Sequence, residues 1–276
     1  MATRPVILSI AGYDPSSGAG VTADIKTAAA LGCYAVTCIT ALTVQSTQGV
    51  FGVEPVRPET IRETLSRLAD DFKFAAVRIG MLGTGEAVEL AAEFLRERRP
   101  KNVVLDPVIR SSSGAELLDG GGVKAIRSQL LSLADVITPN LLEALMLAEL
   151  NALPKTSSDW ETDLPLIRQA AQELHRMGAK AIVITGGDLQ EANDYVSVSD
   201  NQGVWDQTLR ARRMESQATH GTGCAFATAI ACRLARGSQV IDAVRDAKEY
   251  VRQAMAAAYP VGKGVGPLNH HYRVGE

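Results

Sequence analysis

Residues 5–12 read PVILSIAG, a short apolar run that ends in a glycine. Five similar runs follow along the chain: YAVTCITAL (34–42), AAVRIGM (75–81), KNVVLDPV (101–108), ADVITPN (134–140) and KAIVITGG (180–187). Strands that are apolar at nearly every position must be buried on both faces, as in parallel sheets covered by helices. The alternation of such runs with helical stretches predicts an α/β fold.

The stretches between these runs predict helices over 58–72, 85–99, 121–132, 141–149, 160–177, 223–235 and 239–258. One segment differs, because residues 195–209, YVSVSDNQGVWDQTL, alternate around turn residues and predict a small antiparallel hairpin. The polar segment 151–163 does not change the composition on either side of it. We therefore expect a single domain over 1–276.

Composition narrows the class of protein. The chain has 276 residues, of which 46% are hydrophobic and 21% charged, and its net charge is −3. This balance argues against nucleic acid or a membrane as a partner. No apolar run approaches a bilayer span and the N-terminus lacks the pattern of a secretory signal, so we expect a cytoplasmic protein. The cysteines have no disulfide or zinc spacing, and reduced thiols are expected at Cys33, Cys38, Cys224 and Cys232.

Polar residues and glycines follow the predicted strands at their carboxyl ends. In open parallel sheets, ligands bind outside these ends. We therefore expect one shared rim, formed by Gly12, Asp14, residues 43–45, Gly80, Met81, Asp106, residues 140–143 and residues 186–188.

Two of three glycine-rich stretches carry weak phosphate-binding patterns. Residues 18–23 fit G-x-G-x-x-A, but the second strand runs into Thr43, Val44 and Gln45 instead of the acidic residue of a dinucleotide site. Close packing explains Gly18 and Gly20 as well as ligand contact does. Residues 261–267, VGKGVGP, lack the Walker A pattern and are interpreted as a structural loop.

The third stretch, His220-Gly221-Thr222-Gly223-Cys224, precedes a helix of small residues. Unpaired N–H groups in a first helical turn bind anions, and glycines let a phosphate approach the backbone. The alternative is a plain turn with a buried cysteine. The concentration of special residues in five positions favours a site for phosphoryl transfer.

The segment SIAGYDPSSGAG, with TVQST, IGMLG, VVLDPV, ITPNLLEA, THGTGC and VGKGVGP, resembles the hydroxymethylpyrimidine and phosphomethylpyrimidine kinases of thiamine biosynthesis, in the ribokinase-like superfamily. The match keeps its order from about residue 7 to residue 271. It implies a three-layer αβα sandwich and a homodimer. It also implies transfer of the ATP γ-phosphate to 4-amino-5-hydroxymethyl-2-methylpyrimidine, and then a second phosphorylation to the diphosphate.

The resemblance also implies roles for single residues. Gln45 would bind the pyrimidine edge and Asp24 would lie near the substrate hydroxyl, with a ring pocket formed by Gly12, Ala19, Val44 and Met81. Asp106 and Glu143 would lie near Mg²⁺, although Asp106 could instead cap a turn and Glu143 could be a first-turn helix charge. The catalytic group would be Gly221, Thr222, Gly223 and Cys224, and ATP would contact Asn140, Thr185, Gly187, Thr219, His220 and Lys248.

Several alternatives stay open. Cys224 either accepts the hydroxyl proton or only completes the anion hole, because a helix N-terminus lowers a thiol pKa and nearby phosphates raise it. The sequence departs from the usual family pattern at Tyr13, Arg110 and Asp188. A pyridoxal kinase and a noncatalytic pyrimidine-binding regulator are the rival functions, and loops 110–120 and 151–162 are candidate lids.

Overall fold

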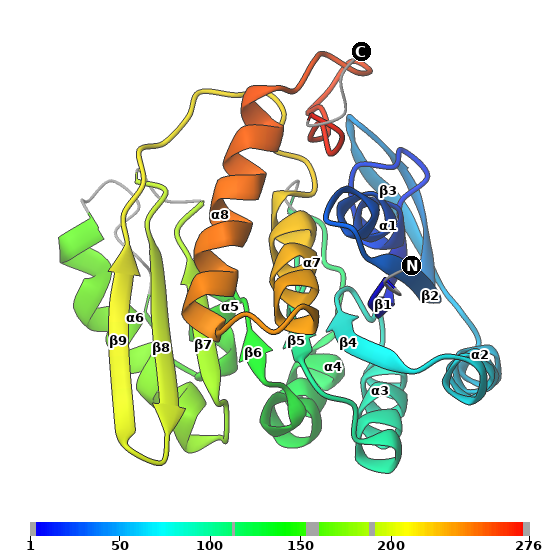
Figure 1. Cartoon of the computed structure of the whole chain (residues 1–276), viewed down its shortest axis with the longest axis horizontal. Helices are drawn as coiled ribbons and strands as arrows, with labels where there is room; N and C mark the ends of the chain where they lie inside the picture. The colour runs from blue at the N-terminus through cyan, green and yellow to red at the C-terminus, as the bar shows by residue number, and fades with distance from the viewer. Residues whose placement is uncertain (1–3, 112–113, 153–159, 188–190, 273–276) are drawn as a thin grey trace.

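The computed structural model describes residues 4–111, 114–152, 160–187 and 191–272. Nine strands form one sheet in the order β3-β2-β1-β4-β5-β6-β7-β8-β9. Strands β2, β1, β4, β5, β6 and β7 pair in parallel, and antiparallel partners flank them at both edges (Figure 1). The strands are β1 (Val6–Tyr13), β2 (Tyr34–Ser46), β3 (Gly49–Pro55), β4 (Phe74–Ile79), β5 (Val103–Leu105), β6 (Val136–Ile137), β7 (Ala181–Thr185), β8 (Asp194–Asp200) and β9 (Gly203–Leu209).

Helices cover both faces of the sheet. One face carries α1 (Gly20–Ala30), α7 (Thr222–Ala235) and α8 (Val240–Ala256), of which α7 and α8 lie side by side in front of the strands in Figure 1. The other face carries α2 (Pro58–Asp71), α3 (Gly85–Arg98), α4 (Gly120–Ala125), α5 (Leu141–Leu147) and α6 (Trp160–Arg176). This arrangement confirms the predicted αβα sandwich.

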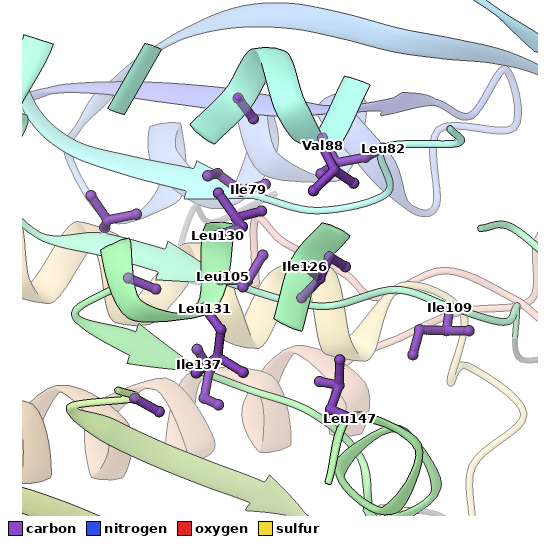
Figure 2. Close-up of a cluster of buried hydrophobic side chains, with 14 of the residues drawn as sticks. Ile79, Leu82, Val88, Leu105, Ile109, Ile126, Leu130, Leu131, Ile137 and Leu147 are labelled. Carbon is purple, nitrogen blue, oxygen red and sulfur yellow. The ribbon is translucent and has the colours of Figure 1, made fainter. Parts of the chain in front are cut away.

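The alternation of side chains along each strand divides the core into two layers. Val104 faces the layer of α1, α7 and α8, whereas its neighbours Val103 and Leu105 face the opposite layer. Figure 2 shows the second layer, where Leu105 of β5 and Ile137 of β6 lie among side chains of the helices. Burial of this apolar surface on both faces is the main favourable contribution to folding.

The helices end within a few residues of the predicted bounds, with one exception. The helix expected over 121–132 is divided into α4 and two short turns, Ile126–Leu130 and Leu131–Leu133. Thr84, Asp119 and Asn140 cap the starts of α3, α4 and α5 with their side chains. These residue types satisfy N–H groups that a helix leaves unpaired at its start.

Two elements were not predicted. Helix α1 buries the polar side chains of Asp24 and Thr27, which interrupts the apolar period on which a sequence prediction depends. Strand β3 has largely exposed or half-buried residues and pairs only with β2. The hairpin predicted over 195–209 is confirmed as β8 and β9.

Parts of the candidate lids, at 112–113 and 153–159, and Asp188 lie outside the described residues. Within the residues that are described, no helix is long and apolar enough to cross a membrane.

Leu130 and Leu142 offer a matched pair for testing the core. Leu130 is fully buried, as Figure 2 illustrates, whereas Leu142 is 48% exposed on α5. We expect Leu130→Ala to lower the free energy of unfolding by about 2–5 kcal/mol, because the substitution leaves a cavity. Leu142→Ala should change it by less than ~0.5 kcal/mol. Urea denaturation measures both, and equal losses would contradict the described core.

Candidate active site

The loop after β1 is organised around the carboxylate of Asp14. Its oxygens accept hydrogen bonds from the backbone N–H groups of Ser16 (2.8 Å), Gly18 (3.0 Å) and Ala19 (2.8 Å). Nε2 of His220 lies 2.8 Å from Oδ2 of the same carboxylate. Burial raises the pKa of Asp14, but these hydrogen bonds outweigh burial and lower it to about 2. The ionised carboxylate therefore ties the loop after β1 to the loop before α7.

Glycines let these two loops touch. A Cβ atom at Gly18 would lie 2.1 Å from Cδ2 of His220, and one at Gly221 would lie 1.8 Å from the carbonyl oxygen of Gly18. Gly221 also has a φ of 79°, in the left-handed region that favours glycine. Close packing, which the sequence left as one explanation for Gly18, is thus observed.

The loop 261–267 supports both sides of this junction. The N–H of Val265 donates to the carbonyl of Thr47 at the β2–β3 turn, over 2.8 Å. The N–H of Gly266 donates to Gln217 O (2.9 Å), and the N–H of His220 donates to Gly266 O (3.2 Å). Through these bonds, residues 261–267 hold neighbouring loops in place, as expected for a structural loop.

Helix α7 begins at this junction without a capping side chain. Within the part of the chain that the structure describes, the N–H groups of Gly223 and Cys224 make no hydrogen bond to another residue's backbone carbonyl. Gly223 is exposed, and a Cβ atom there would meet no atom within 4 Å. Two backbone donors without backbone acceptors, the positive end of the helix dipole and the open space at Gly223 are the features by which helix starts bind anions.

A buried cluster of charges lies beside the start of α7. Arg78 of β4 is completely buried, with Nη1 3.2 Å from Asp24 Oδ2 and Nη2 2.6 Å from Asp106 Oδ2. Asp24 of α1 also accepts hydrogen bonds of 2.6 Å from the hydroxyls of Ser9 in β1 and Thr228 in α7. The cluster joins two strands, two helices and the loop after β5.

Arg78 was missed as a site residue, because AAVRIGM was interpreted only as an apolar strand. A charged residue inside such a run was the available signal, since a buried charge needs a partner. The cluster also buries Asp24 completely. Its carboxylate contacts Arg78, Ser9 and Thr228 and does not reach the surface of the protein.

The thiol of Cys224 interacts with this cluster and with the N–H of Gly20. Burial, with the charges of Asp106 and Asp24, raises the pKa of the Cys224 thiol to about 11, against the lowering effects of Arg78 and the Gly20 N–H. The thiol is therefore protonated at neutral pH. A thiolate ready to accept a proton is not a feature of the site before substrates bind.

Glu143 and Asn140 form a reciprocal cap at the start of α5. The Asn140 side chain accepts from Glu143 N, and Glu143 Oε2 accepts from Asn140 N, each over 2.9 Å. Glu143 Oε1 accepts from the N–H of Ile109 over 3.2 Å. Glu143 thus lies in the first turn of α5, as the alternative from the sequence had it, and its cap connects α5 to the loop that follows Asp106.

The other residues expected at ATP lie around the end of β7, which β4, β5 and β6 separate from β1. Lys248 of α8 donates bonds of 2.6 Å to Asp194 Oδ2 and to Ala192 O. Thr185 lies at the end of β7 beside Asn140, and Gly187 O accepts from Arg213. By contrast, Thr219 and His220 belong to the junction at α7.

The residues expected around the pyrimidine come from several elements and are not all brought together. A Cβ atom at Gly12 would lie 2.9 Å from Sδ of Met81, so these two residues are in contact range. The amide of Gln45 lies 3.2 Å from Nε2 of His220. Val44 is 67% exposed and, because strand residues alternate, faces away from Gln45. The structure thus brings together Gly12 with Met81 and Gln45 with His220, but not Val44.

Asp106 should give the unfolding free energy a measurable pH dependence. Burial raises its pKa from 3.8 to about 6, with Arg78 opposing this shift. The native state then holds the proton more tightly than the unfolded state, so the Asp106 contribution to stability decreases as pH rises from 4 to 6.

Relative to Asp106→Asn, wild type should lose about 2 kcal/mol between pH 4 and pH 7 in magnesium-free buffer. Denaturation curves at several pH values measure this difference. A difference that stays constant or grows with pH would mean that Asp106 ionises at or below its ordinary pKa.

Comparisons with known proteins identify the family of the chain. The family model for phosphomethylpyrimidine kinase matches residues 14–269. A hydroxymethylpyrimidine/phosphomethylpyrimidine kinase of Haemophilus influenzae is 38% identical, over 96% of each chain. A thiamine biosynthesis bifunctional protein of Geobacter sulfurreducens is 39% identical, over 97% of this chain and 52% of that protein. The ADP complex of Bacillus subtilis pyridoxal kinase is 33% identical with a TM-score of 0.85, over 98% of this chain and 99% of that one. The chain belongs to the phosphomethylpyrimidine kinase family, whose members are ATP-dependent kinases.

Proposed function

We propose that this kinase transfers the γ-phosphate of ATP to the hydroxymethyl group of 4-amino-5-hydroxymethyl-2-methylpyrimidine, and then phosphorylates the monophosphate to the diphosphate, in thiamine biosynthesis. The observation that carries the proposal is the start of α7. There, the N–H groups of Gly223 and Cys224 make no backbone hydrogen bond within the described residues, Gly223 borders open space, and the Cys224 thiol lies beside the buried Arg78. Donors fixed in this way stabilise the charge that develops on a transferring phosphoryl group.

We assign Cys224 to the anion hole formed with Gly221, Thr222 and Gly223. Its thiol, with a pKa of about 11, carries a proton at neutral pH and so can donate to the phosphoryl oxygens. Asp24 acts from below the rim, where it holds Arg78 beside the thiol. In this assignment, the backbone N–H groups and the α7 dipole supply most of the stabilisation.

The donor set fits Mg²⁺ that is held mainly by nucleotide phosphates and water. Asp106 is a carboxylate at the rim whose Oδ2 is bound to Arg78. Both oxygens of Glu143 already accept N–H groups, so Glu143 fits a contact through water. Magnesium keeps several waters and needs one or two carboxylates. When bound with ATP, the ion would neutralise charge on the phosphates.

We propose that the nucleotide extends from the α7 junction toward the end of β7. Asn140 and Thr185 are adjacent there, and Lys248 is a cation near the same strand end. The pyrimidine would lie at the other end, against Met81, Gly12 and Ala19, with Gln45 at its edge. The exposed Val44 would contribute only through the backbone of β2.

A homodimer is proposed from the exposed apolar residues of the β2–β3 hairpin. Leu42, Val44 and Phe51 are 47%, 67% and 69% exposed, respectively. Contiguous exposed apolar residues are typical of interfaces. Sedimentation equilibrium of wild type and Phe51→Glu tests this interface.

We also propose a cytoplasmic location, where ATP and reduced thiols are present.

A pyridoxal kinase is the second candidate, because the pyridoxal kinase of B. subtilis has the same fold with 33% identity. Rates of ATP consumption with hydroxymethylpyrimidine, its monophosphate, pyridoxal and pyridoxine separate the candidates. We expect the highest kcat/KM with the two pyrimidines. Preference for pyridoxal would favour the second candidate, and turnover of none of the four would favour a noncatalytic regulator.

The anion hole can be tested with two glycines that occupy first turns of helices. A Cβ atom at Gly223 of α7 or at Gly120 of α4 would meet no atom within 4 Å, so both alanine variants should fold. Gly223→Ala places a methyl group where the phosphoryl group would approach, and we expect kcat/KM to fall by ~10²-fold or more. Because Gly120 lies at the end of a candidate lid, Gly120→Ala serves as the control for folding, and its urea unfolding midpoint should match that of Gly223→Ala. Wild-type activity in Gly223→Ala would refute this position for the phosphoryl group.

A further inference from the structure

Four side chains form a continuous hydrogen-bonded chain between β1, β2 and α7. Asp14 Oδ2 lies 2.8 Å from Nε2 of His220, which lies 3.2 Å from the amide of Gln45. The structure places the amide nitrogen, Nε2, on the His220 side and the amide oxygen, Oε1, 3.0 Å from the hydroxyl of Thr43, and the hydrogen-bond partners of this amide require it to be turned by half a rotation. The same hydroxyl lies 2.9 Å from the carbonyl oxygen of Tyr13. The side chains of Asp14, His220 and Thr43 are mostly buried, so each hydrogen must have a definite position.

The His220 end determines which atom of the Gln45 amide faces the imidazole. Asp14 also accepts three backbone N–H groups and is ionised, so it can only accept from His220. Nε2 of His220 therefore carries a hydrogen. An amide nitrogen facing it would put two donors against each other, whereas the amide oxygen can share that N–H. Because amide oxygen and nitrogen have nearly the same shape, their hydrogen-bond partners decide the orientation.

The Thr43 end accommodates the amide in this turned orientation. A hydroxyl has one hydrogen, and the Thr43 oxygen lies within reach of two acceptors, Tyr13 O at 2.9 Å and Gln45 Oε1 at 3.0 Å. When the hydrogen goes to Tyr13 O, the Thr43 oxygen accepts from the turned amide nitrogen, and the amide oxygen faces His220. The opposite orientation keeps a bond at Thr43 but sets two donors against each other at His220.

We propose that Asp14, His220 and Thr43 are positioning residues that lock the Gln45 amide, with its oxygen toward α7 and its nitrogen toward β1. One N–H and one oxygen lone pair of the amide remain for a ligand. They match a ring nitrogen that accepts beside an exocyclic amino group that donates, which is the edge of a 4-aminopyrimidine. This inference rests on the proposed function and adds a source of substrate selectivity.

A 4-oxopyrimidine presents the opposite pattern, because its ring N–H donates and its oxygen accepts. A freely turning amide could bind both edges by rotating. The locked amide leaves the oxo edge with a donor facing a donor and an acceptor facing an acceptor. Sites built to pair such groups discriminate strongly against ligands that leave them unpaired.

The experiment compares kcat/KM for 4-amino-5-hydroxymethyl-2-methylpyrimidine and for its 4-oxo analogue. We expect wild type to prefer the amino compound by ~10²-fold or more. Thr43→Val and His220→Phe each remove one bond that locks the amide, so this preference should fall by ~10-fold or more. Thr43→Ser keeps the hydroxyl and should keep the preference, which separates the hydroxyl's effect from a change in packing.

A structural defect alone would lower both rates and leave their ratio unchanged. An unchanged ratio in Thr43→Val would therefore overturn the inference, as would a wild-type ratio near one. If His220→Phe does not fold, the Thr43 pair decides, with calorimetric affinities for the two pyrimidines as a second measure of the ratio. Wild type that phosphorylates neither compound would instead refute the proposed function.

Discussion

The pairing of Arg78 with Asp24 and Asp106 is the interaction on which the geometry of the site depends. A guanidinium with no exposure to water is stable only when opposite charges and hydrogen-bond acceptors surround it. The two carboxylates that supply the opposite charge come from α1 and from the loop after β5. The buried charge of Arg78 therefore constrains how α1, α7 and the loop after β5 pack against β4.

The consequences extend to the chemistry of the rim. Two carboxylates share a single guanidinium, and burial raises the pKa of Asp106 and of the Cys224 thiol. The site thus has a protonated thiol next to a cation and two backbone donors. Such an arrangement is suited to receiving negative charge, which agrees with membership of a kinase family.

A second set of constraints acts through backbone contacts. The carboxylate of Asp14 accepts hydrogen bonds from N–H groups of its own loop and from the imidazole of His220. Gly18 and Gly221 allow the loop after β1 and the loop before α7 to touch. The loops after β1 and before α7 are more than 190 residues apart in the sequence. Their contact puts the proposed pyrimidine edge and the proposed phosphoryl site next to each other.

The sequence by itself determined the α/β class, the parallel strands, the β8–β9 hairpin and most helices, because apolar periodicity and turn residues are local signals. It also indicated the α7 glycines and the strand ends as the site, and its family motifs agree with the comparisons. Only the tertiary structure decided that Arg78 is the centre of a buried charge cluster, that Asp24 is buried against it, that Val44 is exposed and that Glu143 caps α5. These outcomes depend on interactions between residues that are distant along the chain. A local sequence pattern cannot predict which charges or hydrogen-bonding groups will be neighbours in the folded protein.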